Sequence, residues 1–377
     1  MDVSMNNAAG QIKVEQSPHL LHISKAEEGE HKQRVRKLNI KFDLSSAYNN
    51  HILPQYKTQI RRDILENVSI ADLRRSSEYL KENVESLIRN ISDFKQVDLY
   101  ASEEKLFRQI GAHFQEEAPH KMILIVGTPE FPLPSNFFCV TRLCDLKEYL
   151  SQPCRIAALI LDPLFFIYRS NYSLHKIEAL RKQCFGSGIT FILDERKTAA
   201  RIHLKGLNFI FQFKADAILL GTNLSNGIPF GAVAGTRQFK GNSTPPEAFA
   251  SSALALMACE KIIEKFQELG DNFHLQLNQR AERFVQIFNN YRPRKKSKIE
   301  MLHLGSIIWI KTLSDKVVQS KLHTKGILTS GQHFIFLPTH LNVKDFSDLA
   351  YRFAMALKNR PRKYGAGKQN YSNKEQS

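Results

Sequence analysis

The chain has 377 residues, a formal net charge of +16 and a pI near 9.6, and 42% of its residues are hydrophobic. This length and composition are typical of a globular protein with a large core and two domains. They argue against a membrane-spanning protein, because no stretch approaches 18 uninterrupted apolar residues, and the N-terminus lacks the basic start and apolar block of a secretory signal.

The cysteines and the positive charge narrow the class of protein further. Five cysteines occur, an odd number without CxxC spacing, which favours reduced thiols in the cytoplasm over a disulfide framework or a zinc site. The densest basic runs, residues 292–298 and 358–368, fall in a predicted loop and a predicted tail. Solvated charge runs are common in such places, so nucleic-acid binding is a secondary hypothesis. The histidines include no HxxxH spacing, and no metal site is predicted.

Five segments follow one another along the chain. Residues 1–37 are polar and lack periodicity, which predicts a mobile tail. Residues 38–95 carry helical periodicity, and residues 96–290 alternate apolar strands with helices and end in one long helix. Residues 291–358 alternate short strands and helices, which predicts a smaller α+β domain, and residues 359–377 form a basic tail.

Four short apolar runs predict the strands of one sheet: "KMILIVG", "RIAALILDP", "TFILDE" and "DAILLG". Runs without polar interruptions, separated by helices, indicate a mostly parallel sheet covered on both faces, and hence the α/β class. Ligands of such sheets bind beyond the carboxyl ends of the strands. The sequence therefore singles out residues 161–163, 193–195 and 220–223 as the lining of a site.

Two linked motifs carry a family resemblance. One apolar strand ends in Asp194 and Glu195, followed by Thr198 and Arg201, and the next strand runs into a glycine-rich turn in "ILLGTNLSNGIPFGAVAG". This order resembles the class III aminotransferases of the pyridoxal-phosphate-dependent fold-type I superfamily, and among them the glutamate-1-semialdehyde aminomutases. The resemblance covers residues 97–357, and it implies a fold-type I large domain followed by a smaller C-terminal α+β domain.

The resemblance implies a pocket for pyridoxal phosphate, and it assigns residues to that pocket. Asp194 and Glu195 would stand at the cofactor ring, and Ser102 would start the helix that holds the phosphate. The family's Schiff-base lysine corresponds to Thr222 here, and a hydroxyl cannot form an imine. Glu103 and Glu104 replace the glycine and threonine of the phosphate loop, where carboxylates would repel a dianion.

Other positions of the family's pocket also differ, namely the small residue that packs on the ring, the threonine from the partner subunit, and the aromatic–His–Gly stretch that stacks on the ring. The corresponding or nearest residues here are Arg196, Ala248 with Thr244, and Phe131. Lys214 and Lys240 are taken as the lysines nearest to Thr222, and both lie outside the turn that follows the strand. We therefore expect pyridoxal phosphate to be lost or weakly bound.

Three functional hypotheses follow from these residues. The first is a non-catalytic aminotransferase-like protein that acts by binding, as a regulatory or partner subunit or as a small-ligand binder. The second is an enzyme that uses the cofactor without an imine, or that runs other chemistry with Asp194, Glu195 and His203. The third is a basic nucleic-acid-binding protein. The resemblance also implies a homodimer through the large domain, and it admits an active aminotransferase-like protein, or another protein, as a partner.

Overall fold

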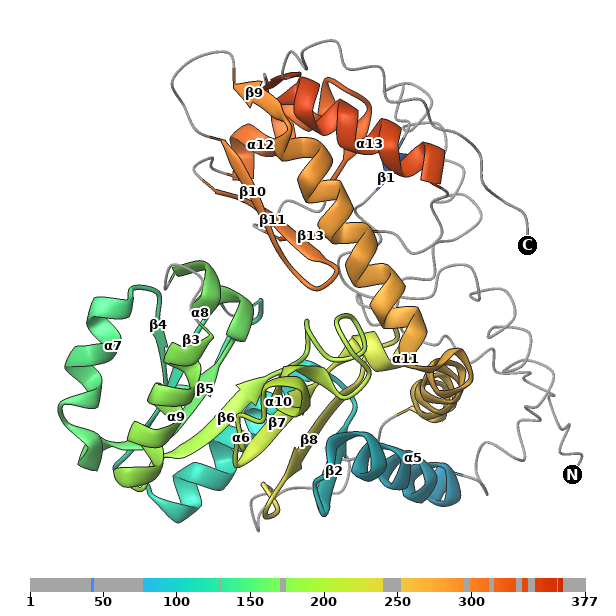
Figure 1. The fold of residues 1–377 in the computed structure, drawn as a ribbon. Helices are drawn as coiled ribbons and strands as arrows, with labels where there is room; N and C mark the ends of the chain where they lie inside the picture. The colour runs from blue at the N-terminus through green and yellow to red at the C-terminus, as the bar shows by residue number, and fades with distance from the viewer. Residues whose placement is uncertain are drawn as a thin grey trace, which may run out of the picture.

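The computed structural model describes residues 42–43, 77–128, 130–169, 174–239, 252–293, 299–311, 315–329, 334–337, 343–357 and 359–361. The predicted N-terminal tail, most of the predicted helical segment before residue 77, and nearly all of the basic tail lie outside these ranges. Within them, the chain forms a large part around one sheet and a smaller part at the far end of a long helix (Figure 1). No helix in these ranges is both long and apolar enough to cross a membrane.

Seven strands form the main sheet, in the order β2-β8-β7-β6-β5-β3-β4. Neighbouring strands run parallel except at β8, which is antiparallel to both β7 and β2. The predicted α/β class with a mostly parallel sheet is confirmed, although part of the stretch expected as a glycine-rich turn forms strand β8. The strands are β2 (Gln96–Tyr100), β3 (Met122–Val126), β4 (Phe137–Val140), β5 (Ile156–Leu161), β6 (Thr190–Asp194), β7 (Ala217–Leu220) and β8 (Gly231–Gly235).

Both faces of this sheet are covered, which explains why its central strands are apolar throughout. All six residues of β5 are buried, and alternate side chains join different cores: Leu159 and Leu161 on one face, Ala158 and Ile160 on the other. Among the described helices, α6 (Glu103–Glu117) packs into the second core. The helices that pack into the first core are α5 (Ser77–Ser92), α7 (Leu143–Leu150), α8 (Pro163–Arg169), α9 (His175–Gly186), α10 (Gly206–Phe211) and the first half of α11 (Ala253–Asn289).

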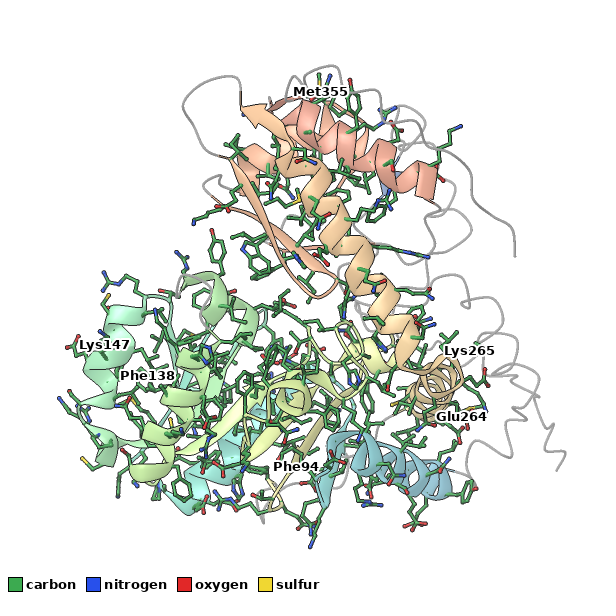
Figure 2. All side chains as sticks on the ribbon, in the orientation of Figure 1. Phe94, Phe138, Lys147, Glu264, Lys265 and Met355 are labelled. Carbon is green, nitrogen blue, oxygen red and sulfur yellow. The ribbon has the colours of Figure 1, made fainter. Side chains whose placement is uncertain are left out.

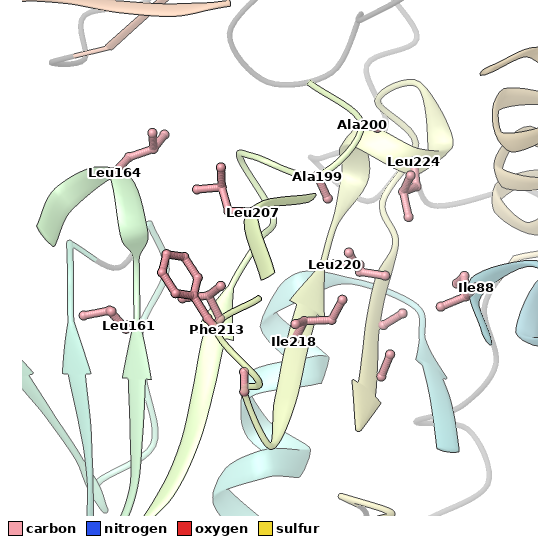
Figure 3. Packing of buried hydrophobic residues seen from close by; sticks show 14 of the residues in the cluster. Ile88, Leu161, Leu164, Ala199, Ala200, Leu207, Phe213, Ile218, Leu220 and Leu224 are labelled. Carbon is pink, nitrogen blue, oxygen red and sulfur yellow. The ribbon is translucent and has the colours of Figure 1, made fainter. Parts of the chain in front are cut away.

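Figure 3 shows part of the first core, where Leu161, Ile218 and Leu220 of the strands pack in one cluster with Leu207 of α10 and Ile88 of α5. At the outer edge of the sheet, Phe138 of β4 and Lys147 of α7 mark the side farthest from the long helix (Figure 2). The polar residues at the carboxyl ends of these strands are therefore supported by a close-packed core.

The long helix α11 (Ala253–Asn289) connects the two parts and confirms the long helix predicted from the sequence. Gly270 interrupts it with φ 64° and ψ 179°, a conformation open to glycine and strained for other residues. Before Gly270, buried residues such as Ile262 and Phe266 belong to the large core. After it, Phe284 and Phe288 belong to a separate core in the smaller part.

The smaller part is built on a three-stranded antiparallel sheet of β10 (Glu300–Leu304), β11 (Ile307–Lys311) and β13 (Phe334–Phe336). Helices α12 (Asp315–His323) and α13 (Val343–Ala356) pack with α11 around its core. Trp309 is buried on β11. The remaining elements are β1 (Phe42–Asp43), β9 (Tyr291–Pro293), β12 (Ile327–Leu328), β14 (Asn359–Pro361) and the short 3-10 helices η2 (Pro153–Arg155) and η3 (Thr222–Ser225).

Candidate functional site

Three polar strand ends meet at one edge of the main sheet. β5, β6 and β7 are parallel neighbours, so Asp162, Asp194 and Thr222 follow their carboxyl ends side by side. Asp194 is the last residue of β6. β7 ends at Leu220, and after Gly221 the 3-10 helix η3 begins at Thr222. The structure thus brings together the strand ends that the motifs singled out.

Arg196 forms a two-pronged ion pair with Asp194. Its Nε and Nη2 donate to Oδ1 and Oδ2 of Asp194 at 2.8 and 2.7 Å, and its backbone N–H donates to Oδ1 at 3.2 Å. Both side chains are buried, with exposed fractions of 6% and 8%. Asn223 donates to the Arg196 carbonyl at 2.6 Å, which holds the backbone of the same residue from the β7 side. Both carboxylate oxygens of Asp194 are therefore engaged by a residue two positions along the chain.

The remaining contacts of the Arg196 guanidinium close the site. Nη1 donates to Oε2 of Glu103, at the start of α6, at 2.5 Å. The guanidinium carbon lies 4.8 Å from the ring centre of Phe107 and 5.5 Å from that of Phe131, and these two rings meet edge to face at 5.2 Å. The cation is therefore held between two carboxylates and against two aromatic rings, which combines charge-assisted hydrogen bonds with cation–π attraction.

Charge is stable in this buried position because each group compensates the other. Burial by itself would raise the pKa of the Asp194 carboxyl, but the Arg196 guanidinium holds that pKa below its ordinary value. Burial would lower the pKa of Arg196, and the carboxylates of Asp194 and Glu103 instead raise that pKa well above its ordinary value. Asp194 and Arg196 are both ionised at neutral pH.

Glu103 also binds the residue at the expected imine position. Its Oε1 accepts hydrogen bonds from the Thr222 backbone N–H at 3.0 Å and from the Thr222 hydroxyl at 3.1 Å. A side chain at Gly221 would collide with the same carboxylate, so this approach depends on glycine. Asp194, Arg196, Glu103 and Thr222 form one continuous hydrogen-bonded chain across the strand ends.

The other residues at the start of α6 have structural roles. The Ser102 hydroxyl accepts from the Lys105 backbone N–H at 3.2 Å, which makes Ser102 the N-cap of the helix. Glu104, which the sequence placed beside the phosphate, instead pairs with Arg108 at 2.6 Å on the helix surface. One of the two predicted acids faces the site, and the other does not.

Glu195 points away from the Arg196 cluster, although it follows Asp194 directly. Its carboxylate accepts from the Leu207 backbone N–H at 3.0 Å, from the Asn208 backbone N–H at 2.6 Å, and from the Thr198 hydroxyl. It therefore holds the first turn of α10 in place. Complete burial raises the pKa of the Glu195 carboxyl despite these bonds.

Lys197 is a site residue that the sequence analysis missed. Its ammonium lies 3.2 Å from Asp162 Oδ2 and 3.3 Å from Glu130 Oε1, and the side chain is 16% exposed. Burial would lower the pKa of Lys197, but the two carboxylates outweigh it and raise the pKa to about 12. An amine held protonated in this way is not a nucleophile. The run "DERK" at a strand end was the available signal, since two acids followed by two bases at a buried edge must find ion-pair partners there.

The other residues considered from the sequence lie elsewhere or outside the described ranges. Lys214 is exposed just before β7, at the opposite end of that strand from Thr222. His203 pairs with Asp271 at 3.4 Å beside the kink in α11, and its ring stacks on Phe209, so it lies away from the Arg196 cluster. Lys240, Thr244 and Ala248 lie outside the described residues. Among the described residues, no three His, Cys, Asp or Glu side chains gather as a metal site.

Pyridoxal phosphate, the cofactor that the resemblance implies, does not fit these side chains. Arg196 engages the carboxylate that would hold the ring nitrogen, its guanidinium lies on the aromatic rings, and Glu103 stands at the phosphate end. The cavity left between Phe131 and Asp194 measures about 10 Å³, which is room for about one water molecule. Since small-molecule pockets measure roughly 300–1,000 Å³, the site is filled by the protein's own side chains.

Comparison by sequence relates part of the chain to aminomutases. No model of a known protein family matches this chain. A stretch of 172 residues is 26% identical to a glutamate-1-semialdehyde 2,1-aminomutase of Francisella tularensis subsp. mediasiatica and covers 43% of this chain and 39% of that protein. The aminomutase of Legionella pneumophila subsp. pneumophila is 29% identical over 164 residues, 37% of this chain and 38% of its own length. The matched stretch spans about two fifths of the length of these curated relatives.

Comparison of structures extends the likeness over most of the chain. A transaminase with PLP bound superposes with a TM-score of 0.65 at 16% identity, over 83% of this chain and 84% of that one. A glutamate-1-semialdehyde aminomutase from Pseudomonas aeruginosa PAO1 gives 0.64 at 11% identity, over 84% and 83%. At these identities the likeness is one of fold. The resemblance to aminotransferases drawn from the sequence motifs is confirmed.

Proposed function

We propose that this aminotransferase-like chain has lost transaminase and aminomutase chemistry and acts by binding, as a regulatory or partner subunit or as a small-ligand binder. The observation that carries the proposal is the Arg196 guanidinium, which fills the position expected for the cofactor ring and occupies both oxygens of Asp194. Thr222 supports it, because a hydroxyl tied to Glu103 supplies neither the imine nor the mobile proton that the family's lysine provides.

The same proposal includes the expected assembly and location. We place the chain in the cytoplasm on the strength of its five unbridged cysteines. We propose a homodimer formed through the large part, as the resemblance implies, with a related active protein as the alternative partner. Sedimentation velocity at several concentrations tests the dimer, and a monomer at all of them would reject it. Limited proteolysis near residue 291 tests the proposed boundary between the two domains.

The cofactor test is a titration of the purified chain with pyridoxal phosphate. We expect no imine absorbance and no saturable binding below millimolar cofactor. Losing two or three charge-assisted contacts of about 1.5–3 kcal/mol each weakens binding by at least about a hundredfold. Micromolar uptake by the unaltered chain would reject the proposal, and turnover of an amino donor would favour the enzyme hypothesis instead.

A lysine returned to the imine position sharpens this test. We expect Thr222→Lys alone to leave the chain without pyridoxal phosphate, because Arg196 and Glu103 still fill the site. Combining it with Glu103→Gly and Arg196→Ala removes both obstacles, so the triple variant should take up more cofactor than the single one. Glu104→Thr is the matched control, since Glu104 lies on the helix surface and its change should add nothing.

A further inference from the structure

We infer that the polar edge of the main sheet is a binding site for a planar cation, and that its occupant is the chain's own Arg196. The guanidinium occupies this pocket in the way that a bound ligand would, but it belongs to a residue only two positions along the chain from its principal partner, Asp194. The inference rests on the proposed function for the loss of the cofactor. It adds the chemical class of the group that took the cofactor's place.

The contacts of Arg196 make up a complete recognition site. One carboxylate receives two parallel N–H···O bonds at 2.8 and 2.7 Å, a second carboxylate receives a third bond at 2.5 Å, and two aromatic rings cover the cation. Planarity is required, because the fork geometry matches a guanidinium or amidinium and not the tetrahedral ammonium of lysine. The pocket therefore selects by shape as well as by charge.

A second arginine provides a comparison within the same chain. Arg142 makes the same fork with Asp145, at 2.9 and 2.8 Å, but its side chain is 74% exposed. Among the described residues, no aromatic ring lies over Arg142, and Asp145 is its ion-pair partner. An Arg–Asp fork by itself does not make a receptor, and enclosure by Glu103, Phe107 and Phe131 is what distinguishes the Arg196 pocket.

The test is chemical rescue of an emptied pocket. Arg196→Ala leaves the backbone held by Asn223, but it removes the cation that pairs with the buried carboxylates of Asp194 and Glu103. We therefore expect the melting temperature to fall by about 6–20 °C. Added methylguanidinium or acetamidinium chloride, at millimolar concentrations, should restore part of that loss in proportion to the logarithm of its concentration. Methylammonium and sodium chloride at equal ionic strength should not, because neither forms the planar fork.

The matched controls are the unaltered chain and Arg142→Ala, whose melting temperatures should not respond to the planar cations. If Arg196→Ala does not accumulate as folded protein, Arg196→Ala/Glu103→Gln carries the same test with one stranded carboxylate fewer. Equal rescue by all four salts, or none by the planar cations, would overturn the inference and leave the proposed loss of the cofactor standing. Cofactor uptake by the unaltered chain would reject the proposed function, whatever the rescue shows.

Discussion

Two arginine–aspartate forks of nearly equal bond length lie in the large part, one at the outer edge of the sheet and one at a central strand, and their surroundings differ. The Arg142–Asp145 fork lies at the start of α7, on the outer edge of the sheet, in water. The Arg196–Asp194 fork lies at the carboxyl end of β6, under two aromatic rings. An exposed pair gains little, because water and salt compete with it, whereas breaking a buried pair leaves a charge without solvent. Enclosure, and not bond length, decides what each fork contributes.

The largest effect should come from removing the carboxylate of the buried fork. Asp194→Ala leaves Arg196 buried with Glu103 as its remaining ion-pair partner, and we expect a loss of about 3–5 kcal/mol in the free energy of unfolding. Urea unfolding followed by circular dichroism measures the loss. A decrease below about 1 kcal/mol would show that water enters the site and that the comparison fails.

An intermediate effect should follow at Lys197, which is less enclosed than Arg196. Lys197→Met keeps the aliphatic stem but takes the ammonium away from Asp162 and Glu130, and we expect a loss of about 1–3 kcal/mol. Asp162 still accepts the Leu164 and Phe165 backbone N–H groups at 2.9 and 3.1 Å, which limits the cost. The same unfolding assay ranks this variant against Asp194→Ala, and a larger loss here would reverse the predicted order.

A smaller, pH-dependent effect separates the neighbouring acids. The folded-state pKa of Asp194 is lowered, so its contribution is fully present above the ordinary value of about 3.9 and is lost as the pH falls through the folded pKa. Asp194→Asn should therefore flatten the acid limb of stability against pH. The pKa of Glu195 is raised, so its contribution is present below about 4.3 and is lost as the pH rises through the folded value. Glu195→Gln should change the curve in the opposite sense, and parallel curves would contradict both assignments.

The smallest effect is expected at the exposed fork. The pKa of Asp145 is lowered by its hydrogen bond from Arg142, and the pair is open to solvent, with exposed fractions of 74% for the Arg142 side chain and 28% for that of Asp145. Asp145→Ala should leave the melting temperature within measurement error at physiological salt. A clear decrease would mean that the fork holds α7 in place, and enclosure would no longer explain the difference between the two pairs.

The sequence predicts four of the seven strands of the main sheet, β3, β5, β6 and β7, and the edge at which the site lies, because apolar runs and their order along the chain carry that information. It predicts less about which side chains meet there. Arg196 was noted as a departure from the family, but its fork with Asp194 depends on the turn that β6 makes at its end. Glu103 and Glu104 are equivalent in the sequence, and the rotation of α6 decides which one faces the site. Lys197 could not be found from the family's imine position, because that position follows β7 at Thr222 and Lys197 follows β6.

The kink at Gly270 has a mechanical consequence for the smaller part of the molecule. The segment of α11 from Gly270 to Asn289 is a lever of about 28 Å at 1.5 Å per residue. A rotation of about 10° at the two backbone torsions of Gly270 would carry the far end of this lever through about 5 Å, by the same helix geometry. Contacts between the two parts limit such a swing, because Ser306 donates to the Arg201 carbonyl at 2.9 Å and Phe334 meets Tyr168 edge to face. A substitution at Gly270 that broke these contacts would change the radius of gyration measured by X-ray scattering.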